Sequence, residues 1–276
     1  MTYSTLMAHL AVERANDSVL SVAADLAERL GASVIGIAAC QPLQIIYGAG
    51  YVAGEIVDMD REEIDEEMRK LEANFRAAFA VAHANPQWRA ARTPRSLAAY
   101  IATEARAADL IITAPDRATG LVNNSRRVGI GELAMRAGRP VLIVPDDAKT
   151  LDLEHVVIGW HDSRETRRAV ADSLPILALA GRVTVVELAT EDRLVESRQS
   201  LDEVVAWLKR HQIEAEALIA PLDGAVTARL EEIARERRAG LMVAGAYGHN
   251  RVREWMFGGV TCDLLMHPAR CTLVSH

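Results

Sequence analysis

The chain carries one succession of segments twice, and this repeat limits the folds that it can adopt. In each copy a short apolar run is followed by a stretch with helical periodicity, and further apolar runs come later. The matched runs are 6–10 with 156–160, 31–37 with 181–186, 108–113 with 239–244, and 139–144 with 270–274. Apolar runs that alternate with helices predict βαβ units, and right-handed crossovers then place helices on both faces of a parallel sheet.

Two tandem α/β domains follow from this repeat. Each half has segments for about five strands and four helices, which predicts a five-stranded, doubly wound parallel sheet flanked by helices in each domain. Helices are expected at 17–30 and 163–179. The polar stretch 145–150 is the expected linker, so we assign one domain to residues 1–146 and the other to residues 153–276.

The two halves are expected to pack against each other. Each ends in an apolar strand, at 141–144 and 272–274. An unpaired edge strand favours pairing with another strand, which would make an intrachain pseudo-dimer of the two domains. A homodimer of the whole chain is a second arrangement compatible with the sequence.

The first half contains additional residues at 41–60. They include the glycine-rich stretch 47–51, which could be taken for a phosphate loop. No buried strand directly precedes it, so we expect a surface excursion instead. Residues 61–84 predict a long amphipathic helix, and the acidic run within 62–67 is expected to be a solvated helix start rather than a metal site.

The most informative motif for function lies in the second half. An apolar strand leads into a turn with Gly245 and Gly248, and then Gly258 and Gly259 precede a predicted helix at 260–267. Glycines let the backbone approach a ligand closely, and free N–H groups at a helix start bind anions. The arrangement indicates a phosphate site, while a plain βα turn that binds nothing is the alternative.

The spacing Gly245-x2-Gly248-x9-Gly258 resembles the nucleotide-binding signature of the universal stress protein family. That signature normally continues with serine or threonine, whereas here Gly259 follows and the first hydroxyl is that of Thr261. The resemblance covers both halves and implies a Rossmann-like fold of the adenine nucleotide alpha hydrolase type. It also implies that the C-terminal domain binds an adenine nucleotide, ATP, ADP or AMP, with Mg²⁺ as an ion that can accompany it.

Polar residues that follow the glycine turn can contribute to phosphate binding. His249 and Arg251 can reach phosphate oxygens through charge-assisted hydrogen bonds, whereas Arg253 is expected to be a solvated loop residue. Thr261 lies in the first turn of the predicted last helix, where a hydroxyl can donate to a phosphate or simply cap the helix.

The base and sugar of the nucleotide are expected near the ends of two other strands. By resemblance, His161 or its neighbour Asp162 replaces a family aspartate that contacts adenine or ribose, and Leu188 matches a position that lines the adenine. The alternatives are a helix N-cap at Asp162-Ser163 and a plain core role for Leu188. The expected nucleotide-binding residues are His161, Asp162, Leu188, Gly245, Ala246, Tyr247, Gly248, His249, Arg251, Gly258, Gly259, Val260 and Thr261.

The matching loop of the first half lacks these properties. Ala114 replaces the first glycine, Pro115 removes a backbone donor, and Asp116 places a negative charge where an anion would sit. Gly129 and Gly131 flank the start of the fourth predicted helix, but the loop before them is unsuited to phosphate. We therefore expect the first domain to be a structural copy that pairs with the second or binds a ligand other than a nucleotide.

Charge and composition narrow the partners and the compartment. The net charge of −7 argues against binding to nucleic acid, and no apolar run reaches the ~18 residues of a membrane span. Neither a signal peptide nor a metal-type spacing of Cys40, Cys262 and Cys271 is visible, so we expect a cytoplasmic protein with reduced thiols.

The expected role is that of a stress-response regulator or scaffold, whose nucleotide-bound state is read by protein partners that the sequence does not identify. The alternatives are an interaction scaffold without nucleotide and a slow nucleotide hydrolase. No nucleophile elbow, Walker lysine or His-Glu-x-x-His motif is present, so weak ATP hydrolysis is the most that we expect as an enzymatic activity.

Overall fold

The computed structural model describes residues 2–12, 14–42, 54–80, 86–115, 126–222, 224–246 and 268–276. The elements of the first half are β1 (Thr5–His9), α1 (Asp17–Leu30), β2 (Ser33–Cys40), α2 (Gly54–Ala78), β3 (Gln87–Arg92), α3 (Leu97–Glu104), η1 (Ala105–Ala107), β4 (Leu110–Thr113), α4 (Ile130–Ala137) and β5 (Val141–Ile143). Those of the second half are β6 (Val156–Trp160), α5 (Arg164–Leu177), β7 (Val183–Ala189), η3 (Glu191–Arg193), α6 (Leu194–Arg210), β8 (Ala215–Pro221), α7 (Val226–Glu236), β9 (Leu241–Gly245) and β10 (Cys271–Ser275).

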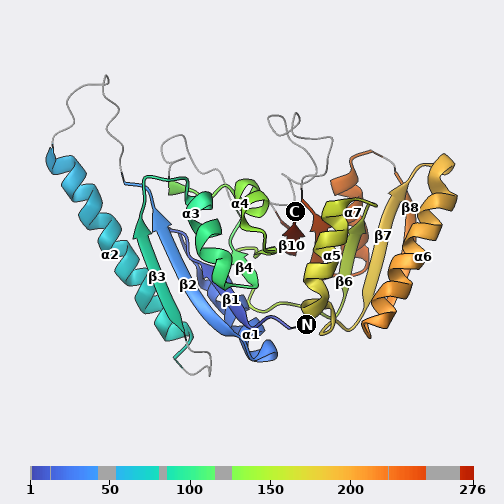
Figure 1. Cartoon of the computed structure of the whole chain (residues 1–276), viewed down its shortest axis with the longest axis horizontal. Coiled ribbons are helices and arrows are strands. Elements are labelled where there is room, and N and C mark those ends of the chain that lie inside the picture. Colours follow the sequence, from blue (N-terminus) through green and yellow to red (C-terminus); the bar gives the residue numbers. More distant parts are fainter. Residues whose placement is uncertain are drawn as a thin grey trace, which may run out of the picture.

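All described strands join one 10-stranded sheet with the order β3-β2-β1-β4-β5-β10-β9-β6-β7-β8. Figure 1 shows this succession from β3 at one side to β8 at the other, with both ends of the chain near the middle. Each half contributes five neighbouring strands, and within each half all pairs are parallel. The doubly wound α/β architecture expected from the sequence repeat is confirmed.

The halves meet where β5 and β10 pair antiparallel. In this pairing Val141 lies opposite Val274, and Leu142 lies opposite Leu273. All four side chains are fully buried. The apolar strands that end the two halves therefore pair with each other, as their sequences led us to expect, and neither presents a bare edge to solvent.

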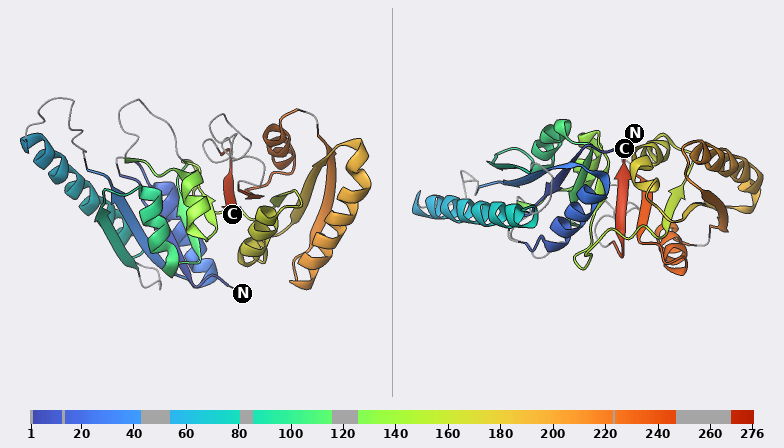
Figure 2. Two further views of the ribbon diagram at one scale, coloured as in Figure 1. Left: turned by 45° about the horizontal axis from the view of Figure 1, so that its top comes forward. Right: turned by 90° about the horizontal axis from the view of Figure 1, so that it is seen from below.

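Helices cover both faces of the sheet (Figure 2). One buried cluster runs through both halves beneath α1, α2, α5 and α6, while α3 and α4 cover a second cluster and α7 covers a third. Strand side chains alternate between the faces, so Leu142 and Leu273 belong to the first cluster and Val141 and Val274 belong to the second. The first cluster thus gives the two halves a shared core.

Helix α1 illustrates how local sequence sets these elements. Its apolar residues recur at helical spacing, and Val19, Ala23 and Leu26 are buried against the sheet. The helix ends at Gly31, whose φ of +63° is the left-handed conformation that glycine adopts at low cost. The observed bounds, Asp17–Leu30, match the expected helix.

The linker is held against α1 and does not hang free between the halves. The Ser18 hydroxyl donates to the Asp146 carbonyl, Asp25 accepts the Leu151 N–H at 3.0 Å, and Arg29 donates to the Leu151 carbonyl at 3.1 Å. Leu151 and Leu153 are buried in the shared cluster. The linker itself is mostly exposed, so it crosses the surface and is anchored at both of its ends.

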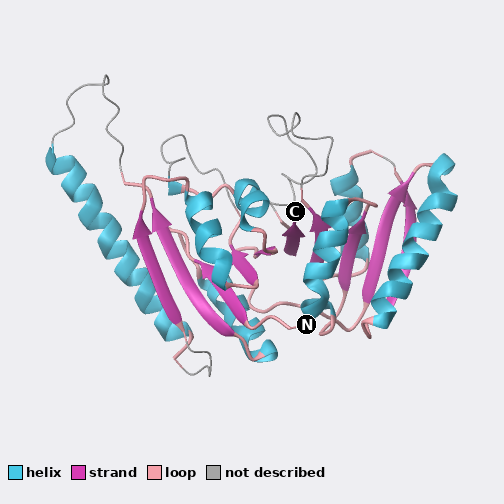
Figure 3. Cartoon of the chain, viewed as in Figure 1, coloured by secondary structure: helices cyan, strands magenta, loops and turns pink. Residues whose placement is uncertain are grey.

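Helix α2 differs from the expected one in both bounds. It spans Gly54–Ala78, so residues 54–60, which we expected in a surface excursion, are helical (Figure 3). Within the helix Ile64, Met68, Leu71 and Phe75 are buried at helical spacing. The expected excursion was wrong for these last two turns, where Ile56 and Met59 are exposed and no buried apolar stripe marks the helix. Residues 43–53 lie outside the described part.

No helix in the described ranges is both long enough and apolar enough to cross a membrane.

Replacement of Leu273 by alanine tests the seam between the halves. The side chain is fully buried opposite Leu142, so its loss should cost about 2–5 kcal/mol of unfolding free energy. Because the core is shared, chemical denaturation followed by circular dichroism should show one transition for both halves. Leu194→Ala, at a residue that is 42% exposed on α6, is the matched control and should change stability by less than about 0.5 kcal/mol. Two separate transitions in the unaltered protein would contradict the shared core.

Candidate functional site

The strand order of the second half reverses between β6 and β9, the position at which open α/β sheets form a ligand crevice. From β6 the chain continues through α5 to β7 on one side, and β9 lies on the other side. In open α/β sheets ligands bind beyond the carboxyl ends of strands at such a reversal of order. His161 and Asp162 directly follow β6, and Gly245 ends β9, so the fold brings these predicted residues to the same edge.

Gly245 lies in close contact with the first turn of α5. A Cβ atom added to this glycine would lie 2.6 Å from the Thr166 nitrogen and 2.8 Å from the Glu165 carbonyl carbon. Backbone atoms at that distance cannot give way without a shift of the helix. The packing of α5 on β9 is therefore a reason for glycine here in addition to any ligand, and the sequence motif alone does not reveal it.

The loop between β6 and α5 exposes two of the predicted ligand residues. His161 and Asp162 are both exposed, and Asp162 forms an ion pair with Arg167 at 3.7 Å. Ser163 caps α5, since its hydroxyl accepts the Thr166 N–H at 3.2 Å. The capping role that we weighed for Asp162-Ser163 thus belongs to Ser163, and the imidazole and the carboxylate stay exposed beyond the end of β6.

Leu188 lies near the end of β7, the strand that pairs with β6 on the side away from β9. It is half-buried and packs against the cluster beneath α7. This contact supports the core role that we weighed for Leu188, and its remaining exposed surface lies near the same edge of the sheet.

Eight of the predicted site residues lie outside the described part of the chain, at 247–267. They are Tyr247, Gly248, His249, Arg251, Gly258, Gly259, Val260 and Thr261. Their roles in phosphate binding stay predictions. The described structure fixes the root of their loop, Gly245 and Ala246, and the loop's return to the sheet at β10.

Ala246 is held on three sides. Its N–H donates to the Ser275 carbonyl at 2.8 Å, and its own carbonyl lies 2.9 Å from Nδ1 of His276. The side chain is fully buried in the cluster beneath α3 and α4, which belong to the first half. The glycine loop of the second half therefore starts from a residue that the first half helps to hold, a contact between distant segments that sequence reasoning missed.

Glu187 is a buried carboxylate near this edge that the sequence analysis did not single out. It lies on β7 in register with Trp160, whose indole N–H donates to the Ser200 hydroxyl at 3.0 Å. Burial raises the pKa of Glu187, while the nearby Ser197 hydroxyl and His161 oppose the increase. The available signal was a glutamate inside the apolar run Val183–Ala189.

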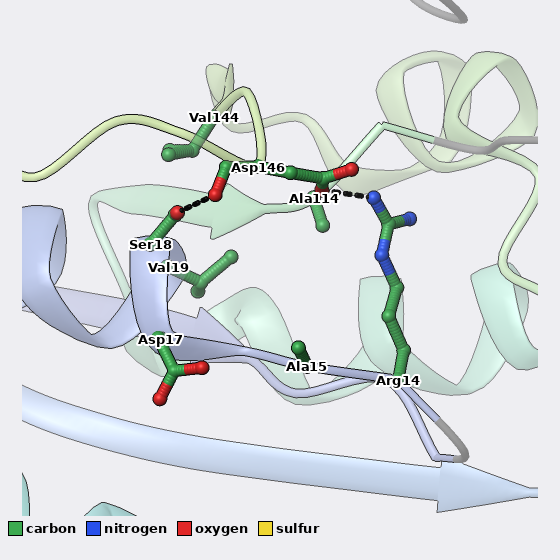
Figure 4. Close-up of a pocket in the computed structure, with 8 residues that line it drawn as sticks. All are labelled: Arg14, Ala15, Asp17, Ser18, Val19, Ala114, Val144 and Asp146. Atoms are coloured by element: carbon green, nitrogen blue, oxygen red, sulfur yellow. Dashed lines mark hydrogen bonds and ion pairs between the residues drawn. The ribbon is translucent and has the colours of Figure 1, made fainter.

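The equivalent crevice of the first half, between β1 and β4, holds a pocket of about 200 Å³. Arg14 extends across it (Figure 4) and donates to the Pro115 carbonyl and to the Asp146 carboxylate. Ser18 donates to the Asp146 carbonyl, so three connecting segments are tied together at this point. We expected this half to be unsuited to phosphate because of Pro115 and Asp116; Asp116 is outside the described residues, and Arg14 is a feature that we missed.

Two findings bear on the chemistry open to these crevices. His9, at the end of β1, is buried with Nδ1 2.8 Å from the Thr113 hydroxyl, and burial together with Arg14 lowers its pKa to about 4. This imidazole is therefore neutral near pH 7 and is not a cationic phosphate ligand. Among the residues that the structure describes, no cluster of three or more His, Cys, Asp or Glu side chains could hold a metal ion.

The packing of Gly245 on α5 can be tested by Gly245→Ala. The added methyl group meets backbone at 2.6 Å, so we expect a loss of about 1–3 kcal/mol in unfolding free energy, as for an overpacked core. Gly54→Ala is the control, because an added Cβ at the start of α2 has no atom within 4 Å. Thermal denaturation of both variants gives the answer, and equal melting temperatures would refute the close contact.

Glu187→Gln should change how stability depends on pH. Burial raises the pKa of Glu187 in the folded protein. The contribution of this group to stability is therefore fully present below its unfolded pKa of about 4.3, and it is lost as pH rises through the folded pKa. The glutamine variant lacks this loss, so its melting temperature should exceed that of the unaltered protein at pH 8 and approach it at pH 4. If the melting temperatures of the two proteins changed in parallel between pH 4 and pH 8, the shifted pKa would be contradicted.

Comparisons with known proteins show which solved structures have a similar fold. No protein-family model matches the sequence, and no curated protein matches it either. A universal stress protein from Archaeoglobus fulgidus DSM 4304 has the same fold, with a TM-score of 0.72 and 14% identity over 98% of this chain and 95% of its own. A protein of unknown function from Pseudomonas aeruginosa PAO1 aligns with a TM-score of 0.61 and 14% identity over 99% and 92% of the two chains.

A third structure, from Pseudomonas aeruginosa UCBPP-PA14 and provisionally assigned to the universal stress proteins, aligns with a TM-score of 0.61 and 14% identity. It covers 99% of this chain, and this chain covers 93% of it. These alignments extend over both halves of the chain. The chain therefore has the fold of the universal stress proteins that it matches.

Proposed function

We propose that this chain is a tandem universal stress protein that binds one adenine nucleotide, reversibly, in its C-terminal half. The observation that carries the proposal is the position of the root of the glycine loop. This root, Gly245-Ala246, lies at the carboxyl end of β9 beside β6, where the strand order reverses. Ligands of open α/β sheets bind at this point, and the glycine spacing is suited to a phosphate.

The residues opposite the loop suit the rest of a nucleotide. His161 and Asp162 are exposed at the end of β6, so both side chains are available to a base or sugar. A carboxylate accepts hydrogen bonds from ribose hydroxyls or an exocyclic amine, and an imidazole can donate or accept. We assign these two residues to the nucleoside and the glycine loop, with His249, Arg251 and Thr261, to the phosphates.

The asymmetry of the halves supports a stoichiometry of one. In the first half the Arg14 guanidinium extends across the equivalent crevice and is neutralised by Asp146. The remaining pocket of about 200 Å³ is below the usual size of a small-molecule site. The first half then serves to complete the sheet and the shared core.

The proposed role is regulatory. Nucleotide occupancy would be read by protein partners as a stress-response signal, with ATP, ADP and AMP as the candidate ligands and Mg²⁺ as an accompanying ion. A scaffold that binds no nucleotide is the second candidate, and the replacement of the usual hydroxyl by Gly259 favours it. Slow hydrolysis of bound ATP is the third, and it requires a metal ion to neutralise the phosphates.

Acid extraction of the purified protein, followed by chromatography, tests whether an adenine nucleotide is carried along. Calorimetric titration with ATP, ADP and AMP then gives stoichiometry and affinity. We expect one site per chain, and we expect Gly248→Val to abolish binding, because a β-branched side chain occupies the space of the phosphate and does not tolerate a glycine backbone conformation.

Pro115→Ala is the matched control in the first half. It keeps the carbonyl that Arg14 contacts and should leave affinity for nucleotide unchanged. Two sites per chain, or full affinity in a folded Gly248→Val protein, would show that the site is placed wrongly. No binding by the unaltered protein would favour the scaffold, and release of phosphate over hours would favour the hydrolase.

A further inference from the structure

We propose that Tyr3, acting through Asp172 and Ser275, positions the root of the C-terminal glycine loop, so that the first half sets the ligand affinity of the second. The proposal rests on the nucleotide binding proposed above and adds a means of regulating it. Its basis is a set of hydrogen bonds, partly or fully shielded from solvent, that runs from the first half, through α5, to Ala246.

Ser275 is the residue in direct contact with the loop root. Its backbone carbonyl accepts the Ala246 N–H at 2.8 Å, and its hydroxyl donates to the Asp172 carboxylate at 2.6 Å. Ser275 is 2% exposed and Ala246 is fully buried, while the Asp172 side chain keeps 15% of its surface exposed. One residue of β10 thus joins the start of the glycine loop to helix α5.

Asp172 joins β10 to the first half. Its carboxylate accepts from Ser275 and, at 2.8 Å, from Arg168, while its backbone carbonyl accepts the Tyr3 hydroxyl. The N-terminal turn of the same helix is in contact with Gly245 through Thr166. A displacement of α5 therefore reaches the loop root twice, once through Thr166 and once through Ser275.

Tyr3 is fixed in the first half by its neighbours. The backbone N–H groups of Ser4 and Thr5 both donate to the Asp109 carboxylate, at 2.8 and 3.0 Å, and β1 begins at Thr5. The Tyr3 ring is buried in the shared cluster. Burial, together with the nearby carboxylates of Asp172 and Asp109, raises the pKa of its hydroxyl, which stays protonated and donates.

Tyr3→Phe removes the hydroxyl and keeps the ring, and Ser275→Ala removes the other donor. We expect each to raise the dissociation constant for the adenine nucleotide about 3- to 10-fold, the effect of one buried hydrogen bond. The double variant should lose less than the product of the two, because both bonds end on Asp172. Calorimetric titration with ADP measures all three.

Two controls separate positioning from general destabilisation. Tyr100→Phe removes a hydroxyl from α3 for which the described residues offer no hydrogen-bond partner, and it should bind as the unaltered protein does. Val22→Ala creates a cavity in α1, where the side chain is fully buried, and should lower the melting temperature without changing affinity.

Hydrogen exchange without nucleotide provides a readout that does not depend on binding. Loss of the network should speed exchange of the Ala246 amide in Tyr3→Phe, and Tyr100→Phe should leave it unchanged. If the unaltered protein binds no nucleotide, the proposed function fails. The further proposal then fails as a statement about affinity, and hydrogen exchange still shows whether Tyr3 positions Ala246. Nucleotide binding by the unaltered protein with equal affinity in Tyr3→Phe, or unchanged exchange at Ala246, overturns the further inference alone.

Discussion

The antiparallel pairing of β5 with β10 is the interaction on which the rest of this structure depends. It joins two parallel sheets into one and covers the strand that would otherwise be the exposed edge of each half. It also lets one apolar cluster continue beneath α1, α2, α5 and α6. Because β10 is bonded to β9 on its other side, whatever holds this seam also holds the end of β9, from which the glycine loop starts.

The described root of the candidate site is held in place by that arrangement. Gly245 has no room for a side chain because α5 lies against it, and Ala246 is fixed by β10 and by the core of the first half. A phosphate loop with a firm root loses less conformational entropy when it binds than one that is loose at both ends. In the first half the matching loops are held by a different contact, since the Arg14 side chain donates hydrogen bonds to both Pro115 and Asp146.

The repeat of apolar runs was sufficient to predict the α/β class, the pairing of the terminal strands and the bounds of α1, because each depends on local periodicity. The start of α2 was missed, because the buried apolar stripe begins only at Ile64 and the apolar residues Ile56 and Met59 before it are exposed. Arg14, Glu187 and the contacts of Ala246 could not be predicted, since each depends on segments that the fold brings together from distant parts of the sequence. The glycine spacing indicated the site, but the contact with Thr166 is visible only in three dimensions.

The linker that runs along α1 has a further consequence. In a homodimer every substitution occurs in both subunits, so a change that closes one crevice closes the other as well. Covalent joining through residues 145–150, anchored by Asp25 and Arg29 at Leu151, removes that constraint. Each copy is then free to diverge, as Arg14 in the first half and Gly245 in the second illustrate. The single chain thus always contains one copy of each of the two different halves.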